Sequence, residues 1–237
     1  MTVAATAPPQ ADSTLSAGRR VLCEFLGSGG LAAVVVGSGI AAQQLSPGDT
    51  GLQLLENALS TALGLTVLIL VFAPMSGAQF NPVVTLVDAA TGGRPWRDVW
   101  AYIPTQIAGC VAGTVLANLM FDAPTTWSTT ERATPAHLLA EVMATAGLIV
   151  VIFTLVRTER MALIAPAVGA YIGAAYFFTS STSFANPAIT IGRAVTDTFA
   201  GIAPASVPWY IAAQLAGGAL GWAAVKIILP KRQRPQS

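Results

Sequence analysis

The chain has 237 residues, of which 54% are hydrophobic and only 10% are charged, whereas about 25% of the residues of an ordinary soluble domain are charged. With a mean hydropathy of +0.64, this composition is that of a membrane protein and excludes an ordinary soluble domain. Several uncharged stretches exceed the roughly 20 residues that cross a bilayer, so we expect one membrane domain of about six spans.

The first predicted element is a tail. Residues 1–17 lack the basic start and apolar centre of a secretory signal, and their Ala, Pro, Thr and Ser content predicts disorder. The membrane domain follows over residues 18–229, and residues 230–237 form a short basic tail. The fold class is all-α and polytopic, with expected spans at residues 18–43, 51–73, 97–120, 135–156, 160–179 and 205–229.

Basic residues indicate how these spans are oriented. Six spans place both termini on one side, and ten of the 12 Lys and Arg residues then lie on that side. Only Arg132 and Arg193 fall on the other. The positive-inside rule therefore predicts cytoplasmic termini and a multi-pass protein of the cell inner (plasma) membrane. Orientation in the bilayer explains the basic clusters, so no nucleic-acid partner is expected.

The chain is also an internal repeat. One pair of matching segments, LCEFLGSGGLAAVVV and LAEVMATAGLIVVIF, aligns Glu24 with Glu141. A second pair, WAYIPTQIAGCVAG and PWYIAAQLAGGALG, aligns Gln106 with Gln214 and two pairs of glycines four residues apart, which are predicted to let helices approach closely. Repeat one covers about residues 18–121 and repeat two about 135–229. Because each half holds three spans, the second half enters the membrane inverted.

Each half carries an Asn-Pro motif inside an apolar region, SGAQFNPVVT at residues 76–85 and STSFANPAIT at residues 181–190. Asparagine before proline is a favourable helix start, and the segments that follow are too short to span the bilayer. Non-helical backbone at membrane depth is tolerated where it is buried in protein or lines a water-filled cavity. We therefore expect two half-helices that meet near the midplane, with their positive dipole ends disfavouring cations and protons. The motif residues are Asn81, Pro82, Val83, Asn186, Pro187 and Ala188.

These two motifs, the segments CEFLGS and AEVMAT, and the six-span inverted repeat resemble the aquaporin and aquaglyceroporin family of major intrinsic proteins. The resemblance covers about residues 18–229. It implies a bundle of six helices with two half-helices, one pore in each subunit, and a homotetramer. The implied partners are water, small neutral solutes and the lipid bilayer.

The resemblance also implies a constriction at four positions, which spacing from the motifs assigns to Thr61, Ala174, Ser183 and Ile189. Most water and glycerol channels resemble one another in having arginine at the last position, where this chain has isoleucine. We therefore predict a wide, arginine-free and uncharged filter that passes neutral solutes larger than water. The segment TIGRAVTDTFAGIAP resembles a bacterial branch linked to arsenic resistance, which implies passage of trivalent metalloid hydroxides such as arsenous acid and, as a further candidate, of methylated arsenic acids.

Arg193 allows two interpretations. It lies one helical turn beyond Ile189, so it could add a charge to the outer mouth of the pore. Alternatively Arg193 and Asp197, which are four residues apart, pair with each other as a structural tie. We favour the tie, and the interpretation in which Arg193 narrows a water-selective channel stays open.

Glu24 and Glu141 also have two interpretations. A carboxylate inside a membrane span is a candidate proton relay. In the resembled family the equivalent glutamates brace the loops before the asparagines, and the repeat symmetry favours that role. Gln79 stands where many relatives have histidine, so no titration near neutral pH is expected there. Val83 replaces an alanine, which predicts a small repacking where the half-helices meet.

Two other classes of function fit the sequence less well. An enzyme is disfavoured because the single histidine, His137, is accompanied by no Ser/His/Asp set, metal-ligand cluster or phosphate loop, so no catalytic residue, metal or cofactor is expected. An ion-coupled transporter can share the broken-helix inverted repeat, but the chain has few polar groups within its spans from which to build a coupling site.

Overall fold

The structure is a computed structural model, and it describes residues 15–229. Residues 1–14 of the expected N-terminal tail, and all of the expected C-terminal tail at residues 230–237, lie outside the described residues. The first helix begins at Ala17, so the last residue assigned to the N-terminal tail is helical.

Six helices in residues 15–229 are long and apolar enough to cross a membrane. Short 3₁₀ turns at Met161–Leu163 and Pro204–Ser206 lead into the fifth and sixth of them. Their order and number confirm the expected spans. They are α1 (Ala17–Leu45), α2 (Thr50–Ser76), α4 (Trp96–Met120), α5 (Pro135–Arg157), α6 (Ile164–Phe178) and α8 (Val207–Ile228).

One short helix completes each half, as the Asn-Pro motifs predicted. Helix α3 (Pro82–Ala90) has nine residues, and α7 (Pro187–Gly192) has six and continues as a 3₁₀ turn at Arg193–Val195. Both begin at the proline, with the preceding asparagine as N-cap. Neither is long enough to cross a bilayer, so each is a half-helix within the bundle.

The long helices pack within each half, α1 along α4 and α5 along α8, while α2 and α6 pack across the two halves. Glycines permit the first two contacts. A Cβ atom on Gly113 would collide with the backbone of Gly29, and one on Gly221 would collide with the carbonyl oxygen of Ala146. The close approach predicted from the repeated glycines is therefore present in both halves.

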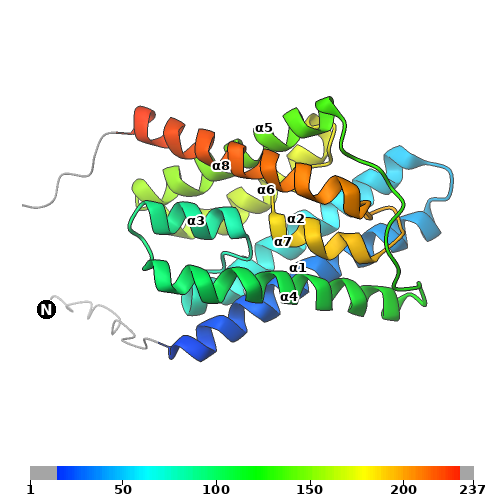
Figure 1. Cartoon of the computed structure of the whole chain (residues 1–237), viewed down its shortest axis with the longest axis horizontal. Helices are drawn as coiled ribbons and strands as arrows, with labels where there is room; N and C mark the ends of the chain where they lie inside the picture. Colours follow the sequence, from blue (N-terminus) through cyan, green and yellow to red (C-terminus); the bar gives the residue numbers. More distant parts are fainter. Residues whose placement is uncertain (1–14, 230–237) are drawn as a thin grey trace, which may run out of the picture.

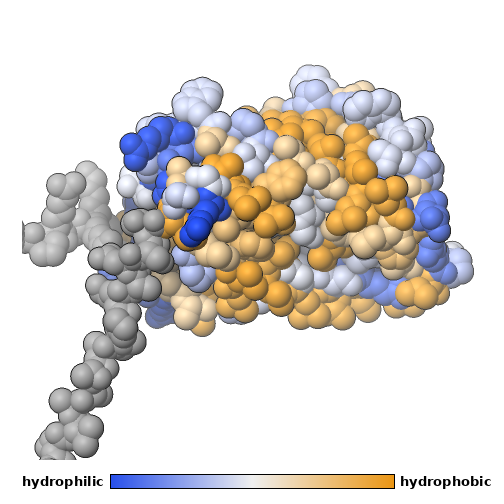
Figure 2. All heavy atoms as spheres, turned by 90° about the horizontal axis from the view of Figure 1, so that it is seen from below, coloured by the Kyte–Doolittle hydropathy of each residue, from blue (hydrophilic) through white to orange (hydrophobic). Residues whose placement is uncertain are grey.

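The first and last described helices place both ends of the described chain at the same end of the bundle (Figure 1). In the view of Figure 2 an apolar belt separates two more hydrophilic ends, as expected for a protein whose helices run along the membrane normal. The end that carries the start of α1 and the end of α8 is called the terminal end below, and the opposite one the outer end.

Candidate functional site

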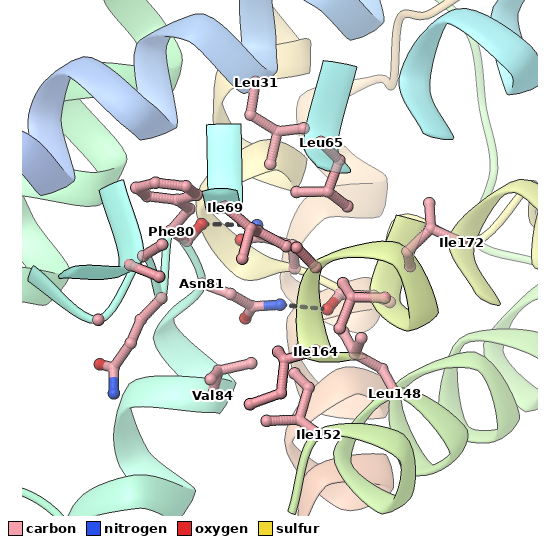
Figure 3. A pocket seen from close by; sticks show the side chains of 18 of the residues that line it. Leu31, Leu65, Ile69, Phe80, Asn81, Val84, Leu148, Ile152, Ile164 and Ile172 are labelled. Carbon is pink, nitrogen blue, oxygen red and sulfur yellow. Dashed lines mark hydrogen bonds between the residues drawn. The ribbon is translucent and has the colours of Figure 1, made fainter. Parts of the chain in front are cut away.

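The two asparagines of the motifs bind each other's loops. Asn81 Nδ2 donates to the carbonyl oxygen of Ala185 at 2.7 Å, and Asn186 Nδ2 donates to that of Phe80 at 2.8 Å (Figure 3). The Oδ1 atom of each asparagine caps its own half-helix. Each amide nitrogen carries two hydrogens and makes one bond in the described protein, so one donor remains for a molecule between the loops.

Left-handed backbone shapes both loops. Ala78 and Phe80 have φ of 46° and 47°, and the equivalent residues Ser183 and Ala185 have φ of 49° and 48°. This conformation costs a non-glycine residue roughly 1–2 kcal/mol. The surrounding structure must therefore hold each loop in place.

Glu24 holds the first loop and is fully buried. It accepts hydrogen bonds from Ser76 Oγ at 2.7 Å, and from the backbone N–H groups of Gln79 at 3.0 Å and Phe80 at 2.8 Å. Gln106 Nε2 donates a fourth at 2.8 Å. These bonds satisfy a carboxylate inside the membrane without any contact with solvent.

Glu141 holds the second loop in the same way and is also fully buried. It accepts from Ser181 Oγ at 2.6 Å, from the N–H groups of Phe184 and Ala185 at 2.9 Å, and from Gln214 Nε2 at 2.6 Å. The geometry supports the bracing role inferred from repeat symmetry, and neither glutamate lines the cavity described next.

Sequence reasoning missed the serines of these networks. Ser76 and Ser181 lie 105 residues apart, the separation that also relates Asn81 to Asn186, so the repeat could have identified them. The two glutamines were recognised only as repeat markers. Their second bonds reach the half-helices, since Gln106 also donates to Thr85 Oγ1 at 3.0 Å and Gln214 to Thr190 Oγ1 at 2.9 Å.

A cavity of about 690 Å³ runs past the asparagines. Its walls opposite the loops are aliphatic, and equivalent helices contribute equivalent residues, such as Leu31 from α1 and Leu148 from α5 (Figure 3). Asn81 points its amide between these side chains. The cavity therefore offers a line of polar groups on one side and hydrocarbon on the other.

The lining stops near the outer end at Thr61 of α2 and Tyr176 of α6, and no residue of either helix nearer the outer end contributes to it. The hydroxyl oxygens of Thr61 and Tyr176 are 3.1 Å apart. Ser183 and Ile189 line the same region. The structure thus brings together three of the four residues that were assigned to a constriction.

Ala174 is the exception, and its assignment was wrong. It lies on the exposed face of α6, whereas Ile172 and Tyr176 on the opposite face line the cavity. A helix turns by about 100° per residue, so a shift of two residues moves a side chain to the far side. Spacing counted from the Asn-Pro motif crosses the loop after Phe178 and cannot fix that rotation. The spacing of four between Ile172 and Tyr176 could have indicated the inner face.

Arg193 is buried, with 2% of its surface exposed, and it lines the cavity. Its Nε donates to the carbonyl oxygen of Ala200, and its guanidinium lies 3.4 Å from the ring centroid of Phe184. No ion pair with Asp197 forms in the described part of the chain. The predicted tie is therefore wrong, and Arg193 lines the cavity beside the filter that was expected to be free of arginine. The arginine reaches the cavity from one turn beyond Ile189.

Asp197 does not face the cavity but joins two outer connections. It accepts from the backbone N–H of Thr129 at 2.8 Å and from its hydroxyl at 3.0 Å, while Ser128 Oγ lies 3.4 Å away. The backbone hydrogen bond from Thr129, followed by that from its hydroxyl, lowers the pKa of Asp197 below its ordinary value. Asp197 is thus a structural residue of the outer loops.

At the terminal end a different polar group lines the cavity. Gln79 Nε2 donates to Asp88 Oδ2 at 2.6 Å, and Arg94 Nε lies 3.3 Å from the same oxygen. Arg94 also donates to the carbonyl oxygen of Ser76 at 2.9 Å. Gln79 lines the cavity, and its Oε1 atom is buried and has no partner in the described protein.

The sequence profile of the major intrinsic protein (MIP) family matches residues 12–185. The chain belongs to the major intrinsic protein family. Family membership makes it a channel protein and not an enzyme. In residues 15–229 there is also no group of three or more His, Cys, Asp or Glu residues placed to hold a metal ion.

Relatives in the family include aquaglyceroporins. The aquaglyceroporin AqpS of Rhizobium meliloti is 45% identical over 212 residues, which is 89% of this chain and 90% of that protein. The glycerol uptake facilitator protein of Streptococcus pneumoniae is 31% identical over 71% of this chain and 79% of its own length. The X-ray structure of the aquaglyceroporin from Plasmodium falciparum superposes with a TM-score of 0.70 at 20% identity, covering 91% of this chain and 98% of that one, which shows the shared fold.

Proposed function

We propose that this MIP-family member is a passive channel for water and small neutral hydroxylic solutes, with glycerol-like polyols as the main class. The observation that carries this proposal is the cavity of about 690 Å³ that passes both asparagine amides. A polyol presents hydroxyl groups along one side and carbon-bound hydrogens along the other. The polar loops and the aliphatic walls of the cavity complement these two sides. The names of the relatives from Rhizobium meliloti and Streptococcus pneumoniae agree with this solute class.

The same arrangement accounts for exclusion of cations and protons. The N-termini of α3 and α7 face each other at the asparagines, and their dipoles place positive potential there. Arg193 adds a full positive charge near the outer end of the cavity. A cation would lose its water shell while approaching this charge, whereas a neutral solute exchanges water for protein donors.

We propose a selectivity region formed by Thr61, Tyr176, Ser183, Ile189 and Arg193. This region includes Arg193, whereas the filter expected from the sequence contained no arginine. Trivalent metalloid hydroxides such as arsenous acid are neutral at pH 7 and carry three hydroxyl groups, so they belong to the same chemical class as polyols. Their passage is the finer part of the proposal.

The assembly and its orientation are also proposed. We infer cytoplasmic termini in the cell inner (plasma) membrane because the sequence assigns ten of the 12 basic residues to the side of the termini. Many leucine, valine and tryptophan side chains of the long helices are exposed, which suits both lipid and neighbouring subunits. A homotetramer with one pore in each subunit is expected.

The test is stopped-flow light scattering on proteoliposomes that contain the full chain. Vesicles should shrink under an impermeant osmolyte and re-swell rapidly when glycerol or arsenous acid is the external solute. Ile69→Trp should abolish both fluxes because Ile69 lines the cavity, whereas Val67→Trp on the exposed face of α2 should leave them intact. Glycerol and arsenous acid rates equal to those of protein-free vesicles would reject the solute class. Accumulation of glycerol against its gradient would reject a passive channel.

A further inference from the structure

The repeat-related half-helices pack differently against the long helix of the other half. Helix α7 lies close to α4 because Gly192 has no side chain, and an added Cβ there would meet Cys110 at 2.9 Å. In α3 the equivalent position is Val87, six residues after its asparagine as Gly192 is after its own. Its bulk separates α3 from α8, and these helices touch where Val83 contacts Gly218. A groove remains between them.

This groove has a volume of about 220 Å³ and lies apart from the channel cavity. It runs from Val83, beside the asparagines, toward the terminal end of the bundle, where Trp96 and Trp222 line it. Every residue that lines it is hydrophobic or glycine. Helix α3 lies between α4 and α8 on one face of the bundle, so the groove is on the side of the protein rather than in its interior (Figure 1).

A positive charge stands at the terminal end of the groove. Lys226 Nζ lies 3.5 Å from the ring centroid of Trp222, and it forms no ion pair within residues 15–229. A second cation is near, because Arg157 Nη1 donates to the carbonyl oxygens of Val225 and Leu229 at the end of α8. Two carboxylates of that end, Asp88 and Asp98, are paired with arginines and not with Lys226.

We propose that the groove binds one anionic phospholipid, with an acyl chain between α3 and α8 and the phosphate at Lys226. Trp96 and Trp222 line the groove near its terminal end, where the headgroup of a bound lipid would join its acyl chain. Tryptophan is enriched at this depth, the membrane–water interface, in membrane proteins. A second copy of the chain fits less well, because a helix about 10 Å wide cannot enter a groove of this volume whereas a hydrocarbon chain can. A basic residue at this depth attracts an anionic headgroup.

The test uses tryptophan fluorescence, because bromine on an acyl chain quenches indoles that it contacts. The full chain is reconstituted in phosphatidylcholine with a small, equal fraction of either dibrominated phosphatidylglycerol or dibrominated phosphatidylcholine. Phosphatidylglycerol should quench more strongly, with a preference of about fivefold, the size expected for one basic residue at an anionic surface. Trp222→Phe should remove most of the difference, since the indole that reports contact is then absent.

Matched variants separate the headgroup from the chain. Lys226→Gln should abolish the preference for phosphatidylglycerol, and Arg97→Gln at the same end, whose side chain is 84% exposed, should retain it. Ala219→Phe should fill the groove and reduce quenching by both lipids, whereas Leu220→Phe beside it should not. Melting temperatures confirm that each variant is folded. Equal quenching by the two lipids in the unchanged protein, or unchanged quenching in folded Ala219→Phe, would overturn the proposal.

Discussion

The two re-entrant segments, residues 77–90 and 180–195, share a scaffold but present different chemistry to the cavity. Each has a buried glutamate that accepts four hydrogen bonds, left-handed residues at equivalent positions and an asparagine bound to the opposite loop. In the first segment Gln79 also lines the cavity and donates a hydrogen bond to Asp88. In the second segment Arg193 lines the cavity with its guanidinium over the ring of Phe184, in the same cavity that Tyr176 lines. Symmetry is thus kept where the loops must be held, and it is lost where solutes are distinguished.

The strongest test of the shared scaffold is removal of either brace. Glu24→Gln and Glu141→Gln each replace a carboxylate, which only accepts hydrogen bonds, by an amide. The N–H groups of that amide would face the N–H and O–H groups that now donate to the carboxylate. We expect each to lower the free energy of unfolding by about 3 kcal/mol or more, because hydrogen bonds to a buried charge are lost. Fluorescence-detected size-exclusion chromatography after heating should show the corresponding fall in apparent melting temperature, with Asp122→Asn, an exposed carboxylate, as control. Normal stability with altered proton conduction in either variant would favour the relay role instead.

The asymmetry is tested most directly by Arg193→Gln. At an effective dielectric constant of ~20, the Arg193 guanidinium and a passing cation about 6 Å away repel each other by roughly 3 kcal/mol. We therefore expect cation leakage to rise by at least about tenfold while glycerol flux is kept. Arg94→Gln is the counterpart at the terminal end. Because Arg94 is paired with Asp88, that change should reduce stability and leave cation leakage unaltered. Vesicle conductance and melting temperature distinguish the two, and equal leakage would contradict the asymmetry.

Tyr176→Phe sharpens the same contrast with a smaller change. The variant loses the hydroxyl that lies 3.1 Å from Thr61 and keeps the ring. We expect a loss of about 1 kcal/mol in stability, and a change of a few-fold in the ratio of glycerol to water flux, since one polar partner is lost. Ala174→Ser, on the exposed face of α6, is the control and should leave the ratio unchanged. An equal effect in both variants would restore Ala174 to the selectivity region.

The smallest effect is expected at Asp197, outside the cavity. Because its pKa is lowered on folding, its contribution to stability is present above its ordinary pKa of 3.8 and is lost as pH falls through the folded value. Asp197→Asn should therefore lower the melting temperature slightly at neutral pH, and the difference from the unchanged protein should vanish on acidification. Thr129→Val should reproduce part of this effect. Glycerol flux should stay normal in both, and a large fall in flux would place Asp197 at the pore mouth.

The features that could be predicted from the sequence are those that local rules determine. The six spans follow from uncharged length, the half-helices from Asn-Pro, and the braces from Glu24 and Glu141 at equivalent places in a repeat. Each of these signals lies within one segment or in a comparison of two segments of the same chain. Ser76 and Ser181 were available from the same comparison.

Other features depended on how separate helices are rotated and how far apart they lie. Ala174 and Tyr176 differ by about 200° around α6, and a residue count across the preceding loop does not determine that angle. Arg193 lines the cavity because Phe184 and Ala200 hold it there, which its spacing from Asp197 could not show. The groove beside α3 likewise arises from the contrast between Val87 and Gly192, whose consequence appears only when each half-helix is packed on its neighbour. Sequence by itself determined the topology and the paired asparagines, because periodicity and capping act locally, whereas tertiary packing decided which side chains face the solute.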